Sequence, residues 1–356
     1  MRAIRAALLA WYEANARDLP WRRTRDPYAI WVSEIMLQQT RVETVKPYYA
    51  RFLARFPSVE ALARAPLDDV LASWSGLGYY RRARLLHQGA LHVAEAHGGD
   101  VPRDLDAIRA IPGVGAYTTG AIASQAFDLE APLVDGNVAR VLSRLFRVEQ
   151  DPKRGAGHAR VWALAGELVR GEAPGALNNA LMELGATLCA PREPRCDACP
   201  VRARCQARLA GVERTLPIVA EKKARPVVSE FAAVLRLGGR GAGAGGVLLG
   251  KRVADGLFGG MWEPPRLAAP DRTAFVGELA AMLGVEITLP KRRARAVEHV
   301  LTHRELKVTV YEGALGAAPE RVAAAYRDRY VEVALVPMGD IEQRGVSTLA
   351  RKILGG

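Results

Sequence analysis

All four cysteines of this 356-residue chain fall within one 17-residue segment. They are Cys189, Cys196, Cys199 and Cys205, with the spacing C-x6-C-x2-C-x5-C. Four thiolates this close together can bind one metal centre, and thiolates favour zinc or an iron–sulfur cluster. The spacing favours a cluster, because zinc sites more often use two C-x2-C pairs. The alternative is four free or buried thiols, although free cysteines rarely gather in this way.

A single acid in an apolar helix is the second candidate for chemistry. Asp26 and Pro27 predict a helix start, because Asp is a good N-cap and Pro suits the first helical position. From residue 27 to residue 40 the only charged residue is Glu34, and its neighbours on the helical wheel are Ile30, Trp31, Leu37 and Gln38. A carboxyl group in such surroundings has a raised pKa and can act as a general acid near neutral pH. The alternative is that Glu34 faces solvent through a gap in the packing.

A glycine-containing turn at 111–115, Ile-Pro-Gly-Val-Gly, is a candidate phosphate site. Gly113 and Gly115, on either side of Val114, allow a tight hairpin that leaves backbone N–H groups exposed at the start of the next helix. Such a hairpin can hold a phosphate without using a side chain. The alternative is a helix–turn–helix corner that binds no ligand.

The sequence Asp135-Gly136-Asn137 precedes another predicted helix. Asp135 is an ordinary N-cap candidate. Its place after the glycine hairpin could also turn a second carboxylate toward the cleft of Glu34. Two carboxyl groups in different environments suit cleavage of a glycosidic bond, because one donates a proton to the leaving group while the other stays ionised and stabilises the sugar cation.

The segment 74–82, Trp-Ser-Gly-Leu-Gly-Tyr-Tyr-Arg-Arg, combines glycines, aromatic residues and arginines. Its glycines allow the backbone to approach a duplex closely. An aromatic side chain at the tip could wedge between bases, and Arg81 and Arg82 could meet phosphates. The alternative is an interhelical loop whose tyrosines pack in the core.

Two kinds of secondary structure must position these residues. Residues 1–210 show the periodicity of short helices, for example over 58–73, 81–97, 104–110, 117–126, 137–147 and 158–170. A linker follows over 211–227, and it is rich in Pro and Lys from 216 to 226. The domain 228–356 is predicted to be α+β, with strands at 230–237, 246–251, 307–311 and 330–336, a glycine-rich loop at 238–246 and a helix at 272–283.

The chain is basic, with 50 Lys and Arg against 38 Asp and Glu and a net charge of +12. This charge indicates a polyanionic partner such as nucleic acid, and the alternative is an arginine bias from GC-rich coding. We expect no membrane segment, because no apolar stretch is long enough to cross a bilayer. The gathered cysteines and the lack of a signal-peptide pattern favour a reduced protein of the bacterial cytoplasm.

Taken in order, these segments resemble the helix-hairpin-helix DNA glycosylases, and more narrowly the adenine DNA glycosylases of the MutY type. The matching stretches are 31–40, 74–84, 111–122, 134–138 and the four cysteines, whose spacing is that of the family's [4Fe–4S] loop. Residues 246–265 resemble the family's Nudix-like domain. The resemblance implies an N-terminal all-α helix-hairpin-helix glycosylase domain with a [4Fe–4S] cluster loop over 189–205. It also implies a C-terminal α+β Nudix-like domain.

The resemblance further implies a reaction and its residues. Glu34 would protonate adenine, Asp135 would stabilise the sugar cation with Asn137 beside it, and Tyr117 stands where glycosylases with lyase activity carry a Schiff-base lysine. A phenol cannot form an imine, so we expect a monofunctional enzyme that leaves an abasic site. The residues implied at the DNA are Arg22, Gln38, Gln39, Leu77, Gly78, Tyr79, Gly113, Val114, Gly115, Thr302 and His303.

The four cysteines would hold the cluster, and the arginines around them would present a cationic edge to phosphates. The alternative for those arginines is a solvated charged loop. A loop at 301–303 would read the base opposite adenine, and it is Leu-Thr-His here where the family more often has Phe-Ser-His. The helix over 272–284 has Glu278 as its only acid, so we expect no Nudix hydrolase activity, which needs a glutamate-rich metal-binding helix.

The implied substrate is double-stranded DNA in which adenine is mispaired with 8-oxoguanine or guanine. The implied process is base excision repair by a monomeric enzyme. Two alternatives are an endonuclease III-like or mismatch thymine glycosylase and a non-catalytic DNA-binding repair factor. Tyr117 and the second domain argue against the first, and Glu34 in its apolar helix argues against the second.

Overall fold

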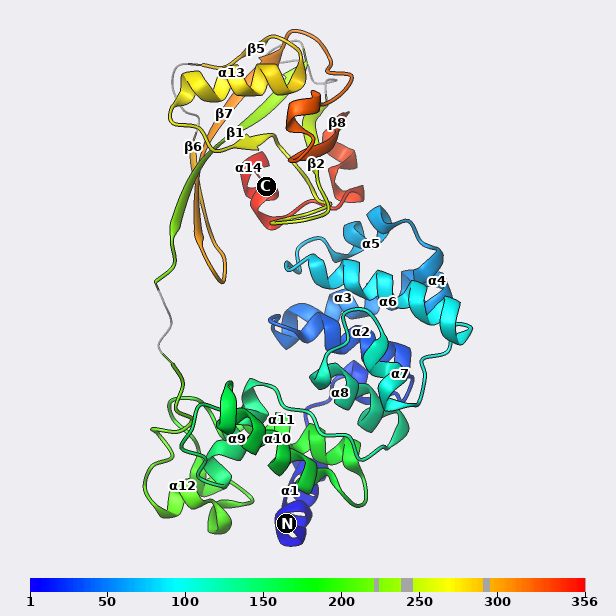
Figure 1. The fold of residues 1–356 in the computed structure, drawn as a ribbon, viewed down its shortest axis with the longest axis vertical. Coiled ribbons are helices and arrows are strands. Elements are labelled where there is room, and N and C mark those ends of the chain that lie inside the picture. Colours follow the sequence, from blue (N-terminus) through cyan, green and yellow to red (C-terminus); the bar gives the residue numbers. More distant parts are fainter. Residues whose placement is uncertain (221–223, 238–245, 291–294, 356) are drawn as a thin grey trace. The chain divides into compact units, whose positions relative to one another are not determined.

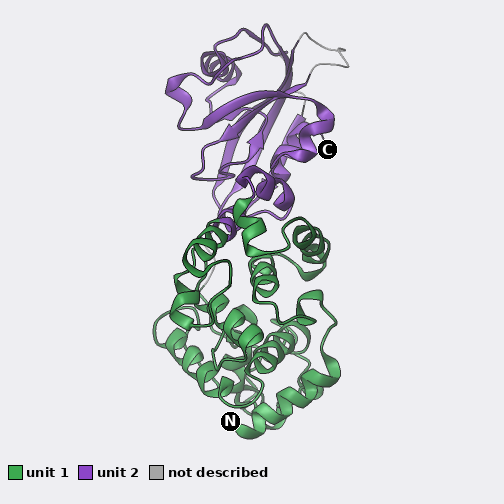
Figure 2. Cartoon of the chain, turned by 90° about the vertical axis from the view of Figure 1, so that its right-hand side faces the viewer, with its two compact units in different colours: residues 1–64, 88–222 green, residues 65–87, 223–356 purple. Residues whose placement is uncertain are grey.

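The computed structural model describes residues 1–220, 224–237, 246–290 and 295–355 (Figure 1). The chain forms two compact units, of which the first contains residues 1–64 and 88–222 and the second contains 65–87 and 223–356 (Figure 2). The boundaries predicted from the sequence, 1–210, 211–227 and 228–356, differ from this division mainly at residues 65–87. This segment packs within the second unit: Leu71 lies against Gly345, and Ser75 Oγ donates a hydrogen bond to the carbonyl oxygen of Val346 (2.5 Å).

The first unit is helical, as predicted. Its helices are α1 (Arg2–Asn15), η1 (Pro20–Arg22), α2 (Pro27–Leu37), α3 (Val42–Arg55), α4 (Val59–Arg64), α7 (Leu105–Ala110), α8 (Ala116–Phe127), α9 (Gly136–Leu145), α10 (Gly155–Val169), α11 (Pro174–Thr187), η2 (Cys196–Ala198), η3 (Arg202–Arg204) and α12 (Gln206–Leu209). Helix α6 (Arg81–His97) begins in the second unit and continues into the first.

One predicted helix is wrong as a single element. The range 58–73 contains two helices, α4 and α5 (Leu67–Trp74), because Pro66 interrupts the run. A proline inside a helix removes a hydrogen bond and clashes with the preceding turn, so Pro66 instead lies just before α5 with an extended backbone (φ −57°, ψ 138°). The other predicted helices are present, with ends that differ by at most three residues.

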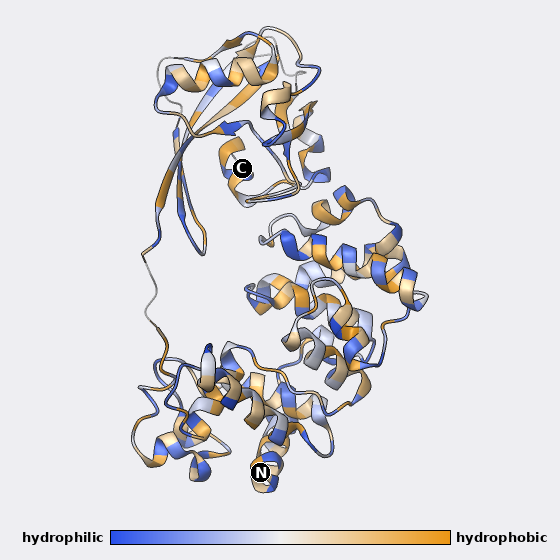
Figure 3. Ribbon diagram, in the orientation of Figure 1, coloured by the Kyte–Doolittle hydropathy of each residue, from blue (hydrophilic) through white to orange (hydrophobic). Residues whose placement is uncertain are grey.

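Apolar faces of five helices form one hydrophobic core of the first unit. The buried residues come from α1, α8, α9, α10 and α11, and they include Ile4, Leu8, Ala121, Val138, Leu142, Leu164, Leu177 and Leu181. Figure 3 shows that most of these helices carry hydrophilic residues as well, as expected for helices with one buried face. Helix α2 differs, because every residue from 28 to 36 is buried. It packs against α3 and α8, so the side chains of its buried part are surrounded by protein.

The second unit contains an eight-stranded mixed sheet. Its strands are β1 (Val227–Leu237), β2 (Val247–Arg252), β3 (Trp262–Glu263), β4 (Arg266–Leu267), β5 (Ile287–Thr288), β6 (Arg295–Val300), β7 (Glu305–Leu315) and β8 (Tyr330–Val336). The main path runs β3-β2-β1-β7-β5, with β4 on β1, β6 on β7 and β8 on β2. Strands β1 and β7 are parallel, and the other pairings are antiparallel.

Two helices cover opposite faces of this sheet. Ala232 and Val234 of β1 pack with α14 (Thr348–Leu354), whereas Ala233 and Leu235 pack with α13 (Arg272–Leu283). Successive side chains of a strand point to opposite faces, so one strand contributes to both cores. This confirms the α+β class predicted for the second domain. The predicted strands and the helix at 272–283 are present, β6 and the two-residue strands were not predicted, and the loop at 238–246 lies almost wholly outside the described residues.

Among the described helices, none combines the length and the apolar character that crossing a bilayer requires.

Candidate active site and cysteine pocket

Helix α2 starts as predicted but ends earlier than the apolar run. Asp26 caps it, because its Oδ1 accepts a hydrogen bond from the backbone N–H of Tyr28 (2.9 Å), and Pro27 is the first helical residue. The helix ends at Leu37, and Gln39 adopts a left-handed backbone (φ 59°), so the last residues of the uncharged run lie outside the helix. Glu34 lies inside the buried part of the helix and is only 3% exposed. The alternative in which Glu34 faces solvent is therefore excluded.

Two side chains of α8 contact the Glu34 carboxyl group. The Tyr117 hydroxyl donates a hydrogen bond to Oε2 (2.7 Å), and the Gln125 amide donates one to Oε1 (3.2 Å). Burial raises the pKa of Glu34, these two hydrogen bonds oppose the rise, and the nearby Asp135 adds to it. The result is a raised pKa, because removal from water disfavours the charged form more than two neutral donors favour it. Glu34 is thus a side chain that keeps its proton to higher pH than an exposed glutamate.

Asp135 combines both roles that the sequence left open. It is the N-cap of α9, since its Oδ1 accepts the backbone N–H of Val138 (2.7 Å). Its Oδ2 accepts a hydrogen bond from the Asn137 side chain (3.0 Å), and its charge acts on Glu34 and Tyr117. Burial raises the pKa of Asp135, and hydrogen bonds from Val138 and Asn137 oppose only part of that rise. Asp135 differs from Glu34 in that one of its donors is the backbone N–H of Val138 at the start of a helix, where the helix dipole favours a negative charge.

Helices α9 and α11 join the acid site to the cysteine segment. Arg140 of α9 donates hydrogen bonds to Asn137 Oδ1 (2.8 Å) and to the carbonyl oxygens of Gly185 (2.9 Å) and Cys189 (2.8 Å). Gly185 has no side chain, and a Cβ atom there would lie 2.7 Å from Cβ of Asn137. The backbone of α11 can approach the start of α9 this closely only because residue 185 is glycine.

Several residues at the site were missed by sequence reasoning. Met182 Sδ lies 3.4 Å from the Tyr117 hydroxyl oxygen. The next residue, Glu183, accepts hydrogen bonds from the side chains of Arg17 and Arg22. Glu183 could have been found by the pattern that revealed Glu34, because it is the only charged residue in α11. Gln125 and Arg17 carried no comparable sequence signal.

All four cysteines line one pocket. The other lining residues are Arg144, Leu188, Pro194, Arg195, Arg202, Arg208 and Glu213. The buried Arg144 holds the segment in place by donating hydrogen bonds to the carbonyl oxygens of Ala190 (2.7 Å) and Pro191 (2.8 Å) and to Cys189 Sγ (3.3 Å). Burial raises the pKa of Cys199 to about 11, so this thiol needs a bound cation to become a thiolate.

The four thiols that line this pocket are the kind of donor that binds zinc or an iron–sulfur cluster. In the part of the chain that the structure describes, no three His, Cys, Asp or Glu side chains converge as they would around one metal ion.

The glycine turn at 111–115 joins α7 to α8. Gly113 has a left-handed backbone (φ 81°), which glycine adopts most easily. Gly115 does not have a left-handed backbone. It is the N-cap of α8 and is extended (φ −96°, ψ 178°), so only one of the two glycines bends the chain as expected. No described atom lies within 4 Å of the place a Cβ would take on Gly115. The first N–H groups of α8 are thus approachable, while the Val114 side chain is buried.

The loop after α5 presents one aromatic residue to solvent. Tyr79 is 46% exposed and has a left-handed backbone, and Gly78 beside it has φ 70°. Leu77 and Arg82 are buried, so the expectation that Arg82 meets a phosphate is wrong. Arg82 instead donates hydrogen bonds to the carbonyl oxygens of Leu77 (3.3 Å) and Gly78 (3.1 Å) and shapes the loop from inside.

The remaining predicted DNA residues lie in two places. In the second unit, Thr302 and His303 are exposed, and the hydroxyl groups of Tyr79 and Thr302 are hydrogen-bonded to each other. In the first unit, Gln38 lies next to Thr118 of α8 (3.5 Å), and Gln39 is exposed.

Comparisons with known proteins agree with this geometry. Residues 32–165 match the model of the HhH-GPD superfamily base excision DNA repair proteins, and residues 240–355 match the NUDIX domain. The chain is 38% identical to the adenine DNA glycosylase of Rattus norvegicus over 365 residues, covering 88% of this chain and 70% of the relative. The values for the adenine DNA glycosylase of Homo sapiens are 38%, 88% and 67%.

Solved structures resemble the helical part. A thermostable thymine-DNA glycosylase aligns with a TM-score of 0.55 and 34% identity, covering 59% of this chain and 96% of that structure. A trapped endonuclease III–DNA intermediate aligns with a TM-score of 0.50 and 23% identity, covering 59% of this chain and 97% of its own, and it shows the fold alone.

Proposed function

Because the chain belongs to the family of adenine DNA glycosylases, we propose that it removes adenine paired with 8-oxoguanine or guanine and leaves the strand intact. It is a DNA glycosylase of base excision repair, and its substrate is DNA. The observation that carries the assignment of the acid is the buried Glu34, whose raised pKa has a physical cause in its surroundings. We also propose that it acts as a monomer in the bacterial cytoplasm, where four thiols gathered in one pocket stay reduced.

In the proposed reaction, Glu34 donates its proton to N7 of the extruded adenine. The bond between C1′ and N9 then breaks, and its electron pair leaves with the protonated base, which departs neutral. The sugar is left as an oxocarbenium-like cation, which the ionised Asp135 stabilises. Water adds to C1′, a proton returns to the site, and the product is an abasic site.

Tyr117 supports a reaction without strand cleavage. Its hydroxyl donates to Glu34, and burial raises its pKa well above the ordinary value for tyrosine, so it remains a neutral donor. Covalent lyase chemistry needs an amine that forms an imine with C1′. A phenol in this place can orient the acid but cannot form that intermediate.

The cysteine pocket is proposed to hold a [4Fe–4S] cluster. Cys189, Cys196, Cys199 and Cys205 would bind it, and Arg144 would donate a hydrogen bond to the first of these sulfurs. Bound there, the cluster would supply a rigid anchor for the loop and no chemistry at the base. Arg195, Arg202 and Arg208 line the same pocket, so a fixed loop would offer these cations to phosphates.

For the opposite base, we propose that Thr302, His303 and Tyr79 of the second unit read 8-oxoguanine. Their exposure and the hydrogen bond between Tyr79 and Thr302 support this assignment. The alternative to adenine excision is thymine excision, because the chain is 34% identical to a thymine-DNA glycosylase.

One assay tests these proposals together. Purified protein is incubated with duplexes that carry adenine opposite 8-oxoguanine, adenine opposite guanine, or thymine opposite guanine, and half of each sample is heated in alkali. We expect breaks at the adenine strands only, and only after alkali. Breaks at thymine would support thymine excision, and breaks without alkali would contradict the monofunctional reaction.

A further inference from the structure

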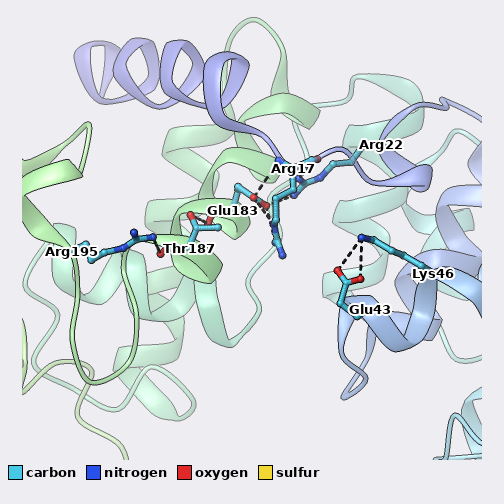
Figure 4. Close-up of polar contacts among 7 residues, drawn as sticks. All are labelled: Arg17, Arg22, Glu43, Lys46, Glu183, Thr187 and Arg195. Carbon is cyan, nitrogen blue, oxygen red and sulfur yellow. Dashed lines mark hydrogen bonds and ion pairs between the residues drawn. The ribbon is translucent and has the colours of Figure 1, made fainter.

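Glu183 of the first unit binds two arginines, the half-exposed Arg17 (43%) and the more buried Arg22 (Figure 4). Its side chain is 0% exposed. The Arg17 side chain donates two hydrogen bonds to it, Nε to Oε1 (2.6 Å) and Nη2 to Oε2 (2.9 Å), and the Arg17 backbone N–H donates a third to Oε1 (3.4 Å). Arg22 adds a fourth, from Nη2 to Oε2 (2.7 Å), and is only 12% exposed. The three side chains come from the segment after α1, from η1 and from α11, so Glu183 joins parts of the chain that are distant in sequence.

The position of Arg22 is held by further contacts of this cluster. Its Nη1 donates to the carbonyl oxygen of Arg17 (3.1 Å), and its guanidinium lies over the ring of Tyr12, 5.4 Å from the centroid. Burial acts to raise the pKa of Glu183, but the hydrogen bonds and charges of Arg17 and Arg22 outweigh it and lower that pKa. Glu183 is therefore an anion at neutral pH, and the cluster carries two positive charges and one negative charge.

This cluster lies beside the acid site. Arg22 is among the charges that act on Glu34, and Met182, one residue before Glu183, contacts Tyr117. The other groups that face Glu34 are Tyr117 and Gln125 of α8 and Asp135 at the start of α9. On α3, which also packs against α2, Glu43 and Lys46 pair with each other (2.9 Å; Figure 4), and the charge of Glu43 acts on Arg17.

We propose that Glu183 is a positioning residue for the glycosylase reaction, which fixes the Arg22 guanidinium beside the acid site and offsets part of its charge. The inference rests on the proposed function of Glu34. An arginine near a catalytic acid favours the ionised form of that acid. Glu183 limits this effect while keeping the guanidinium in place, so that Glu34 can hold its proton next to a cation.

The proposal predicts how the pH profile of base release changes when the charge of the cluster changes. Release requires protonated Glu34, so the rate is high below the pKa of Glu34 and falls as the pH rises through it. Glu183→Gln leaves two positive charges without their counterion, which lowers the pKa of Glu34 and moves the falling limb to lower pH. Arg17→Gln removes one positive charge and moves the limb to higher pH. Glu183→Asp keeps the charge and restores the limb of the wild-type protein.

The experiment measures single-turnover adenine release from pH 5 to pH 9, an interval chosen to span roughly the range between carboxyl and thiol titration. Glu149→Gln is the matched control, because it makes the same substitution in an ion pair with Arg147 whose carboxylate is 53% exposed. We expect Glu183→Gln to slow release at neutral pH by roughly tenfold or more, with the fall in its rate displaced to lower pH, and Glu149→Gln to match the wild-type profile.

Thermal unfolding of each variant separates positioning from folding. Two results together would show that Glu183 has only a structural role and would overturn the inference. Glu183→Gln would lose rate by the same factor at every pH, and the rate of Arg17→Gln would fall over the same pH range as that of the wild type. If Glu183→Gln does not fold, the pH profiles of Arg17→Gln and Glu183→Asp still test the inference. A fall in rate at the wild-type pH in Arg17→Gln then overturns the inference. A wild-type protein that releases no adenine at any pH would instead overturn the proposed function itself.

Discussion

Two glutamates in apolar helices end in opposite states because their partners differ. Glu34 and Glu183 are both buried. Glu34 meets a hydroxyl and an amide, which are neutral donors, and its pKa is raised. Glu183 meets two guanidinium groups, and its pKa is lowered. Burial alone thus does not determine the charge of a carboxyl group. The partner supplied by a distant part of the chain decides which glutamate can donate a proton and which serves as a counterion.

At the residue scale, we predict that Glu34→Gln stabilises the protein. The pKa of Glu34 is raised in the folded state, so its stabilising contribution is complete below the pKa of the unfolded chain and is lost as the pH rises through the folded pKa. Glutamine has the same shape as protonated glutamate but does not ionise, so its contribution to stability does not fall as the pH rises. The melting temperature of the variant should therefore exceed that of the wild type, by about 2–4 °C for each kcal/mol gained.

The comparison of melting temperatures should be made at several pH values. The advantage of Glu34→Gln should be small near pH 4, where roughly half of exposed glutamates are protonated, and it should grow toward neutral and alkaline pH. An advantage that is constant with pH would mean that folding does not shift the pKa of Glu34.

At the element scale, the close approach of α11 to the start of α9 holds the site together. We predict that Gly185→Ala destabilises the fold by about 1–3 kcal/mol, because the added Cβ would lie 2.7 Å from Cβ of Asn137. The substitution should also slow base release, since Asn137 donates a hydrogen bond to Asp135. Denaturant unfolding and single-turnover rates measure the two effects.

Gly166→Ala is the control for this prediction. Gly166 lies inside α10, and no described atom lies within 4 Å of the position of its added Cβ. An alanine there should be neutral or stabilising by about 0.5–1 kcal/mol, because glycine is a poor helix former. Equal destabilisation by both substitutions would show that the contact with Asn137 is unimportant.

The sequence predicted the elements that follow from local chemistry. Asp26 and Pro27 start α2, Asp135 caps α9, and Glu34 is buried, because each depends on neighbours within about one turn. The electrostatic effect of Arg22 on Glu34 could not be predicted, since it depends on how η1 packs against α2. Strand β3 has two residues, too few for any periodicity to show. Pro66 is the sequence signal for the break between α4 and α5, because a proline inside a helix disrupts it.

At the scale of the whole molecule, the residues proposed for catalysis and those proposed to read the opposite base belong to different units. Glu34, Tyr117 and Asp135 belong to the first unit, whereas Tyr79 and Thr302 belong to the second. Residues 65–87 pack with the C-terminal part through Leu71, Ser75 and the ion pair between Asp68 and Lys251 (2.7 Å). Deletion of residues 216–356 would therefore also remove the packing partners of this segment, so point substitutions test the reading of the opposite base more cleanly.

We predict that Thr302→Ala lowers the preference for 8-oxoguanine over guanine opposite adenine. The variant loses the hydrogen bond to Tyr79, and one such bond contributes about 0.5–1.5 kcal/mol, or roughly twofold to tenfold. The ratio of single-turnover rates on the two duplexes measures the effect. Val331→Ala, an exposed substitution in the same unit, is the control. An unchanged ratio in Thr302→Ala would place the reading of the opposite base elsewhere.

The account depends most on the proton of Glu34, and single-turnover release of adenine tests it directly. Wild-type protein and Glu34→Gln are compared on a duplex with adenine opposite 8-oxoguanine over a range of pH, with duplex binding measured in parallel. We predict a wild-type rate that falls as the pH rises, and a variant that binds the duplex but is slower by roughly a hundredfold or more at every pH. Release by Glu34→Gln at close to the wild-type rate would contradict the account.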